Sequence, residues 1–170
     1  MTKTNKYLLI GAIVLIITMS SNSVYASLAT FLKKYEEDNK AALTAYNDGY
    51  NTWTIGWGSI YNYDQNRPVQ EGDTIDQATA DRWLQIEAKS KMDAVKQLVK
   101  VKINNNQLIS LASFAYNEGI NALKTQSFLD ALYHHDLDEL ASVFRKYVYA
   151  DGKILQGLVN RREKEIEYFM

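Results

Sequence analysis

The stretch from Ala45 to Gly58 places the strongest constraint on the fold, because it joins a tight turn to a short strand. Asn47-Asp48-Gly49 predicts the turn, since Asn and Asp tolerate left-handed backbone angles and Gly adopts them freely. Large apolar side chains then alternate with small or polar ones, as in a strand with two different faces: Trp53, Ile55 and Trp57 on one face, Thr54, Gly56 and Gly58 on the other. We expect a ligand to approach the nearly bare face, which begins beside Asp48.

Downstream of this hairpin, apolar residues recur at helical spacing. Asp76 is the expected N-cap of a long helix that could link two lobes, and its apolar stripe contains Ala80, Leu84, Ala88, Met92, Val95 and Val99. Asn104 to Asn106 are expected to form a loop and cap before a helix that closes at Gly119. Further short helices are expected from Ser127 with Asp130 in a capping box, from Asp136 or Asp138 to Tyr147, and from Leu155 to Phe169. With an upstream helix around Leu28 and Leu32, this pattern predicts an α+β protein that is mostly helical, with one small antiparallel sheet.

The first 26 residues have the organisation of a secretory signal. Lys3 and Lys6 precede an apolar run from Tyr7 to Met19, and small residues lead up to Ala26. The run is short for a membrane-spanning helix, which needs about 17–25 residues. We therefore expect residues 1–26 to be a signal peptide, or else an uncleaved signal-anchor that tethers the protein to the inner membrane. Residues 27–170 are expected to form one exported domain, periplasmic or secreted.

Composition argues against several classes of function. The chain has no cysteine, so disulfides and thiolate metal sites are excluded. Its two histidines are adjacent, at His134 and His135, which argues against a histidine metal site and a Ser-His-Asp triad. The net charge is −1 and becomes more negative without residues 1–26, so no broad attraction to nucleic acid is expected. We expect a monomer with no metal, no cofactor and no nucleic-acid partner.

The order of short motifs resembles that of phage-type lysozymes, the endolysins of glycoside hydrolase family 24. Their signature is an aromatic residue with Glu, then Ala-Tyr-x-Asp, then Thr-Ile-Gly-Tyr-Gly. This chain has Tyr35-Glu36, Ala45-Tyr46-Asn47-Asp48 and Thr54-Ile55-Gly56-Trp57-Gly58. Later matches keep the family's order: Gly72 to Asp76, Phe114 to Gly119, Ser127 to Leu129 and Gly157 to Glu165. The resemblance covers about residues 28–169 and implies a lysozyme-like fold, with a cleft between a small hairpin lobe and a larger helical lobe.

The resemblance implies a muramidase, a peptidoglycan hydrolase that cuts the β-1,4 bond between N-acetylmuramic acid and N-acetylglucosamine. Glu36 would protonate the leaving oxygen, while Asp48 and Thr54 would together hold the attacking water, in an inverting reaction. On the larger lobe, the residues expected to bind the glycan strand are Tyr116, Asn117 and Ser127.

Several alternatives stay open. The spacing from Glu36 to Asp48 exceeds the family's usual spacing, so Glu37 is the alternative acid. Ser59 stands where the family commonly has His, which puts a local salt bridge in doubt. The alternative functions are a catalytically silent peptidoglycan-binding module and a lytic transglycosylase, although the Asp-Thr pair favours hydrolysis. Near the C-terminus, Arg161 and Arg162 could bind a muramic carboxylate or a peptide stem, but the expected arrangement is that both pair with Glu165 on the same helix.

Overall fold

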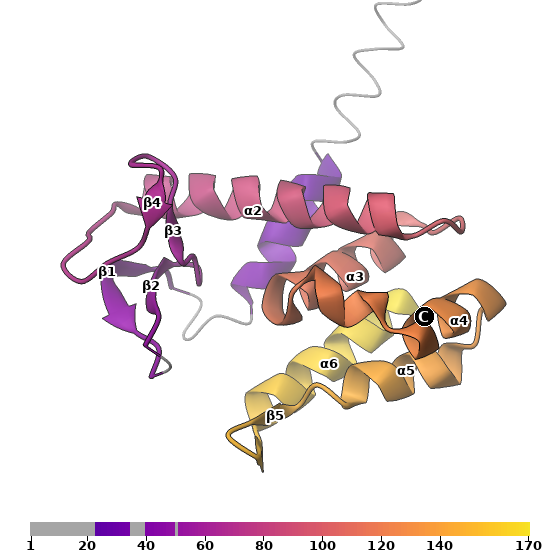
Figure 1. Cartoon of the computed structure of the whole chain (residues 1–170). Helices are drawn as coiled ribbons and strands as arrows, with labels where there is room; N and C mark the ends of the chain where they lie inside the picture. Colours follow the sequence, from indigo (N-terminus) through magenta and orange to yellow (C-terminus); the bar gives the residue numbers. More distant parts are fainter. Residues whose placement is uncertain (1–22, 35–39, 50) are drawn as a thin grey trace, which may run out of the picture.

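The structure, a computed structural model, describes residues 23–34, 40–49 and 51–170. Residues 23–33 are helical, and the other elements follow in chain order (Figure 1): β1 (Ala42–Asn47), β2 (Trp53–Gly56), β3 (Tyr61–Asn62), β4 (Arg67–Pro68), α2 (Gln77–Leu98), α3 (Asn105–Glu118), the 3-10 helix η2 (Ile120–Lys124), α4 (Gln126–His134), α5 (Leu137–Arg145), β5 (Tyr149–Ala150), β6 (Lys153–Ile154) and α6 (Gln156–Phe169). Strands β1 to β4 gather at one end of α2, and α3 to α6 pack together towards its other end. This arrangement confirms the predicted α+β, mostly helical fold with a long linking helix.

The strand after the Asp48 turn is shorter than its alternating pattern predicted. It pairs antiparallel with β1, with Tyr46 opposite Thr54, and it ends at Gly56. Gly56 has φ +67°, a left-handed angle that turns the chain out of the strand. Trp57 therefore packs in the main hydrophobic core, whereas Ile55 lies in a separate cluster with Ala45, Val69 and Trp83. The prediction that Trp57 shares a face with Ile55 is wrong.

The nearly bare face of this strand is covered at Gly56 by the protein itself. A Cβ added to Gly56 would lie 3.4 Å from Ile75 Cδ1 and 3.5 Å from Ala80 Cβ. The glycine therefore allows the hairpin to pack closely against the start of α2. The expectation of a ligand on this face is wrong at Gly56, because the start of α2 already occupies that space.

Helix α2 follows its sequence pattern closely. The Asp76 side chain accepts a hydrogen bond from the Thr79 backbone N–H at 2.7 Å, which confirms the predicted N-cap. The helix buries one stripe against the core, and this stripe includes Trp83, which the prediction omitted, in addition to Ala80, Leu84, Ala88, Met92 and Val95. Val99 is the C-cap, so it lies at the end of the helix rather than within it.

The helical lobe contains one wrong cap assignment and several confirmed ones. Asn104 and Gln107 form a reciprocal capping box at the start of α3, and Asp136 caps α5. Helix α4, however, begins after Thr125, and Ser127 lies within its first turn. Asp130 accepts a hydrogen bond from Gln126 instead, so the capping box predicted at Ser127 is wrong.

The helix at residues 23–33 crosses the domain boundary predicted after Ala26. Val24 and Tyr25 pack against the main core. The Tyr25 hydroxyl donates to Asp93 Oδ1 at 3.2 Å, and the amines of Lys89 and Lys96 lie 5.5 and 5.0 Å from the centre of its ring. Within the described part of the chain, no helix has the length and apolar character that a membrane span requires.

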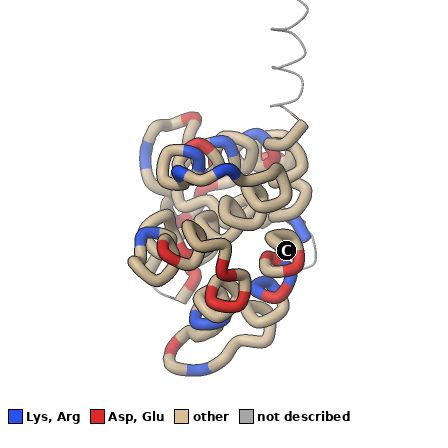
Figure 2. Tube along the Cα trace, turned by 90° about the vertical axis from the view of Figure 1, so that its right-hand side faces the viewer, with Lys and Arg blue, Asp and Glu red and all other residues tan. Residues whose placement is uncertain are grey.

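Acidic and basic residues are mixed along the chain rather than gathered by sign. Figure 2 shows acidic and basic residues interspersed along the chain on the face in view. Some of them pair across elements, as in Arg82 with Asp64 and Arg145 with Glu163. Exposed pairs of this kind contribute about 0–1 kcal/mol each. The surface charge therefore explains little of the stability.

Candidate active site

Asp48 and Thr54 are brought together by the β1–β2 hairpin. Asp48 follows the last residue of β1, and its Oδ1 accepts the Thr52 N–H at 3.2 Å. Its own N–H donates to the Thr52 carbonyl at 3.0 Å. These two contacts close the turn and hold the exposed Asp48 carboxylate beside Thr54, which is buried. The turn residues therefore set the position of both side chains.

A pocket of about 280 Å³ contains these two residues together with side chains from the helical lobe. Its lining consists of Tyr46, Asp48, Thr54, Gly58, Ile60, Tyr116, Asn117 and Arg161. Tyr116 and Asn117 come from the C-terminal end of α3, and Arg161 comes from α6. The structure thus places Asp48 and Thr54 in one pocket with Tyr116 and Asn117.

The remaining predicted site residues are Glu36, Glu37 and Ser127. Glu36 and Glu37 lie outside the described residues. Ser127 is exposed in the first turn of α4, and it is absent from the lining of the Asp48 pocket.

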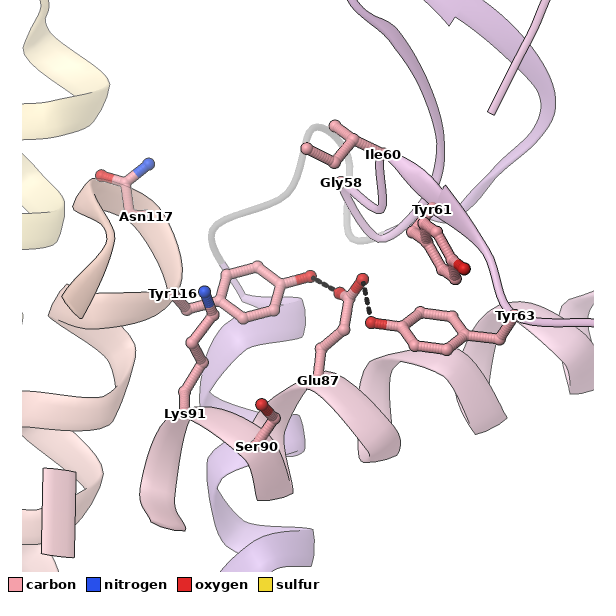
Figure 3. A pocket seen from close by; sticks show the side chains of 9 residues that line it. All are labelled: Gly58, Ile60, Tyr61, Tyr63, Glu87, Ser90, Lys91, Tyr116 and Asn117. Carbon is pink, nitrogen blue, oxygen red and sulfur yellow. Dashed lines mark hydrogen bonds between the residues drawn. The ribbon is translucent and has the colours of Figure 1, made fainter. Parts of the chain in front are cut away.

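A second pocket of about 390 Å³ adjoins the first. The two share four lining residues: Gly58, Ile60, Tyr116 and Asn117. The second pocket extends over α2, where Glu87, Ser90 and Lys91 line it, and reaches Tyr61 and Tyr63 of the small lobe (Figure 3). The two pockets therefore form one groove between the lobes.

Glu87 is the hydrogen-bonding centre of this groove. Its Oε1 accepts from Ser59 Oγ at 2.6 Å and from the Tyr63 hydroxyl at 3.3 Å, and its Oε2 lies 2.9 Å from the Tyr116 hydroxyl (Figure 3). The Tyr116 hydroxyl also lies 2.7 Å from the Trp57 carbonyl oxygen. Burial, and secondly the neighbouring Glu87, raises the pKa of Tyr63 to about 12, so Tyr63 remains a hydrogen-bond donor at neutral pH. This network joins the small lobe to α2 and α3.

Sequence reasoning did not identify Glu87. The available signal was Ser59, which stands where the family usually has His. A buried hydroxyl at this position needs a hydrogen-bond partner, and that partner could lie on another element. In the structure the Ser59 hydroxyl donates a hydrogen bond to Glu87 Oε1. Glu87 lies next to buried Ala88 on α2, at the edge of the apolar stripe, which is where a carboxylate can reach a groove.

A buried cluster on α6 supports the helical side of the groove. Arg161 Nε lies 3.2 Å from Glu165 Oε1, and Arg162 Nε forms an ion pair with Glu165 Oε2 at 2.9 Å, without the alignment of a hydrogen bond. These contacts confirm the expected pairing of both arginines with Glu165. Burial raises the pKa of Glu165, while the two guanidinium groups oppose that shift.

The same cluster orients Asn117. Arg162 Nη2 donates to Asn117 Oδ1 at 2.8 Å, so the amide oxygen points towards the arginine. The Asn117 amide nitrogen is then available to donate to a ligand in the groove. Among the described residues, no three His, Asp or Glu side chains gather as a metal site requires.

The fold is that of a lysozyme, and comparisons identify the family. The chain belongs to the phage lysozyme family, whose model matches residues 36–165. It is 36% identical over 118 residues to an endolysin of Bacillus phage B103, covering 69% of this chain and 43% of the relative. It is 27% identical over 122 residues to a SAR-endolysin of Enterobacteria phage PA-2, covering 72% of this chain and 71% of the relative.

A solved endolysin supports the fold over most of the chain. The endolysin from Escherichia coli O157:H7 phage FAHEc1 superposes with a TM-score of 0.72 at 26% identity, covering 84% of this chain and 90% of that chain. The chain spans less than half the length of the first curated relatives it matches, with 43% of the B103 endolysin covered.

Proposed function

We propose that this protein is a muramidase that hydrolyses the β-1,4 bond between N-acetylmuramic acid and N-acetylglucosamine in peptidoglycan. One observation carries the proposal: Asp48 and Thr54 share a pocket with Tyr116 and Asn117, between the lobes of a phage lysozyme fold. An aromatic ring packs against the C–H face of a sugar, and an amide donates to its hydroxyl or acetamido groups. The groove thus offers a carboxylate and a hydroxyl on one lobe and sugar-binding groups on the other.

The proposed mechanism uses a direct attack by water. Asp48 and Thr54 hold the water on one face of the sugar ring, and Glu36 protonates the leaving oxygen from the other face, with Glu37 as the alternative acid. Inversion of this kind needs the two carboxyl groups about 6.5–9.5 Å apart, so that a water fits between them. No metal or cofactor enters the mechanism. Tyr116 and Asn117 position the glycan. Ser127 has no role in this mechanism, because it does not line either pocket of the groove.

Digestion of purified peptidoglycan by the full chain tests this function. We expect muropeptides with ordinary reducing muramic acid ends, identified by mass. Anhydromuropeptides would instead identify a lytic transglycosylase. Binding to peptidoglycan without any released fragment would identify a silent binding module.

We further propose that the protein is exported and that residues 23–26 remain part of the folded domain. The arrangement of residues 1–26 supports export, and a relative carries the name SAR-endolysin. Cleavage after Ala26 would remove Val24 and Tyr25, which pack against the core. We therefore expect the exported protein, recovered from a bacterial periplasm or medium, to begin before residue 23 by mass spectrometry. A mature N-terminus at Ser27 would contradict this proposal.

A further inference from the structure

The groove contains a cation for which the proposed mechanism has no use. Lys91 lies one helical turn after Glu87 on α2 and lines the larger pocket with Ser90, Tyr116 and Asn117. Figure 3 shows its side chain extending from α2 into the same space as Glu87 and the Tyr116 ring. The Lys91 amine therefore faces the continuation of the groove beyond Asp48.

Lys91 lacks the carboxylate partner that its position would ordinarily provide. A glutamate four residues before a lysine on a helix commonly forms an ion pair with it. Here the Glu87 oxygens are turned instead to the hydroxyl groups of Ser59, Tyr63 and Tyr116. Among the residues that the structure describes, Lys91 is in no ion pair, whereas Lys89 and Lys96 both pair with Asp93.

The Lys91 amine, which pairs with no carboxylate of the described residues, fits a carboxylate of the substrate. An ammonium group in a partly enclosed pocket gains more from an anion than it would in open solvent, because the surrounding dielectric is lower. The Ser90 hydroxyl and the Asn117 amide line the same pocket and add neutral donors. With a net charge of −1 and charges of both signs interspersed along the chain, the protein has no broad attraction to an anionic polymer, so a local cation in the groove would matter.

We propose that Lys91 binds a carboxylate of peptidoglycan while the glycan lies across Tyr116 and Asn117. This inference rests on the proposed muramidase function. The carboxylate belongs either to the peptide stem or to the lactyl ether of a muramic acid that has lost its stem. Both sources present a carboxylate to the Lys91 amine. Lys91 therefore makes the enzyme prefer peptidoglycan with free carboxylates over a neutral polymer of the same sugars.

Steady-state digestion by the full chain tests the proposal on matched substrates. The substrates are intact peptidoglycan and amidase-stripped glycan strands, each used before and after amidation of its carboxylates with carbodiimide. We expect Lys91→Met to raise KM about threefold to tenfold on at least one untreated substrate, with kcat unchanged, which is the scale of a partly exposed charged contact. On the amidated substrates Lys91→Met and the wild type should behave alike.

Two further variants separate a charge effect from a structural one. Lys91→Arg keeps the charge and should stay close to the wild type. Lys102→Met removes the same charge from an exposed residue between α2 and α3, outside the groove lining, and should leave KM unchanged. An effect confined to intact peptidoglycan assigns the stem carboxylate, and an effect on stripped strands assigns the lactyl carboxylate.

Two results would overturn the assignment of Lys91 while leaving the muramidase function standing. One is a wild-type KM for Lys91→Met on both untreated substrates. The other is an equal rise in KM on untreated and amidated substrates, which would mean that Lys91 only shapes the groove. If the wild type releases no muropeptides, the proposed function itself fails, and this outcome is distinct from both.

Discussion

Replacing Asp48 with Asn is expected to slow peptidoglycan cleavage by about 10²–10⁴-fold without unfolding the protein. Asn keeps the side-chain oxygen that accepts the Thr52 N–H, so the turn at the end of β1 should persist. It loses the negative charge that would draw a proton from the attacking water beside Thr54. Initial rates of reducing-end release, measured with circular dichroism of the same sample, check this expectation.

Asp151→Asn is the matched control for Asp48→Asn. Asp151 lies in the turn between β5 and β6, with φ +51°, an angle that Asn also tolerates. It is absent from the lining of both pockets of the groove. We expect this variant to cleave at close to the wild-type rate, and near-wild-type activity of Asp48→Asn would remove Asp48 from the reaction.

The same assay decides between the two candidate acids. Glu36→Gln should lose about 10²–10⁴-fold in rate, because amide groups cannot protonate the leaving oxygen, whereas Glu37→Gln should stay active. Full activity in Glu36→Gln together with loss in Glu37→Gln would assign the acid to Glu37.

Glu165→Gln is expected to lower the free energy of unfolding by about 3–5 kcal/mol, the largest stability effect we predict. The Glu165 side chain has 0% exposure and lies between Arg161 and Arg162, whose side chains are 7% and 0% exposed. The substitution removes the carboxylate that two buried guanidinium groups share, which is costly because one of their compensating charges is lost, although Arg162 keeps its ion pair with Glu118 at 3.1 Å. Urea denaturation of wild type and variant measures the difference.

The control for this prediction is the same substitution two residues earlier on α6. Glu163 pairs with Arg145 at the surface, where the two side chains are 48% and 54% exposed. Exposed pairs contribute about 0–1 kcal/mol, so Glu163→Gln should change the free energy of unfolding by no more than that. A similarly small loss in Glu165→Gln would show that the buried cluster contributes little to stability.

Features that depend on neighbours in the chain were readable from the sequence. Asp76 and Asn104 are helix caps because their side chains reach backbone N–H groups three residues onward. The buried stripe of α2 follows from residues three and four positions apart lying on one helical face. Asp48 and Thr54 come together because a tight hairpin pairs residues that are close in sequence.

The expectation for the bare face at Gly56 failed because it required knowledge of the packing partner. The bare face at Gly56 was expected to face a ligand, and it faces Ala80 instead. Ser127 was expected to bind the glycan, and the structure places it in the first turn of α4, outside the lining of the two groove pockets. The local sequence pattern shows which side chains are small or polar, but it does not show which element packs against them.

The sequence by itself determined the helices, the hairpin that carries Asp48 and Thr54, and the lysozyme-like family of this protein, because these rest on local geometry and on motifs in a fixed order. Only the tertiary structure decided how the groove is built. Glu87, Lys91 and Tyr116 lie on different elements from the hairpin, and they meet it only when α2 and α3 pack around the small lobe. That packing turns Glu87 towards three hydroxyl groups and leaves the Lys91 amine facing the groove. Helical spacing alone would have predicted an ion pair between Glu87 and Lys91.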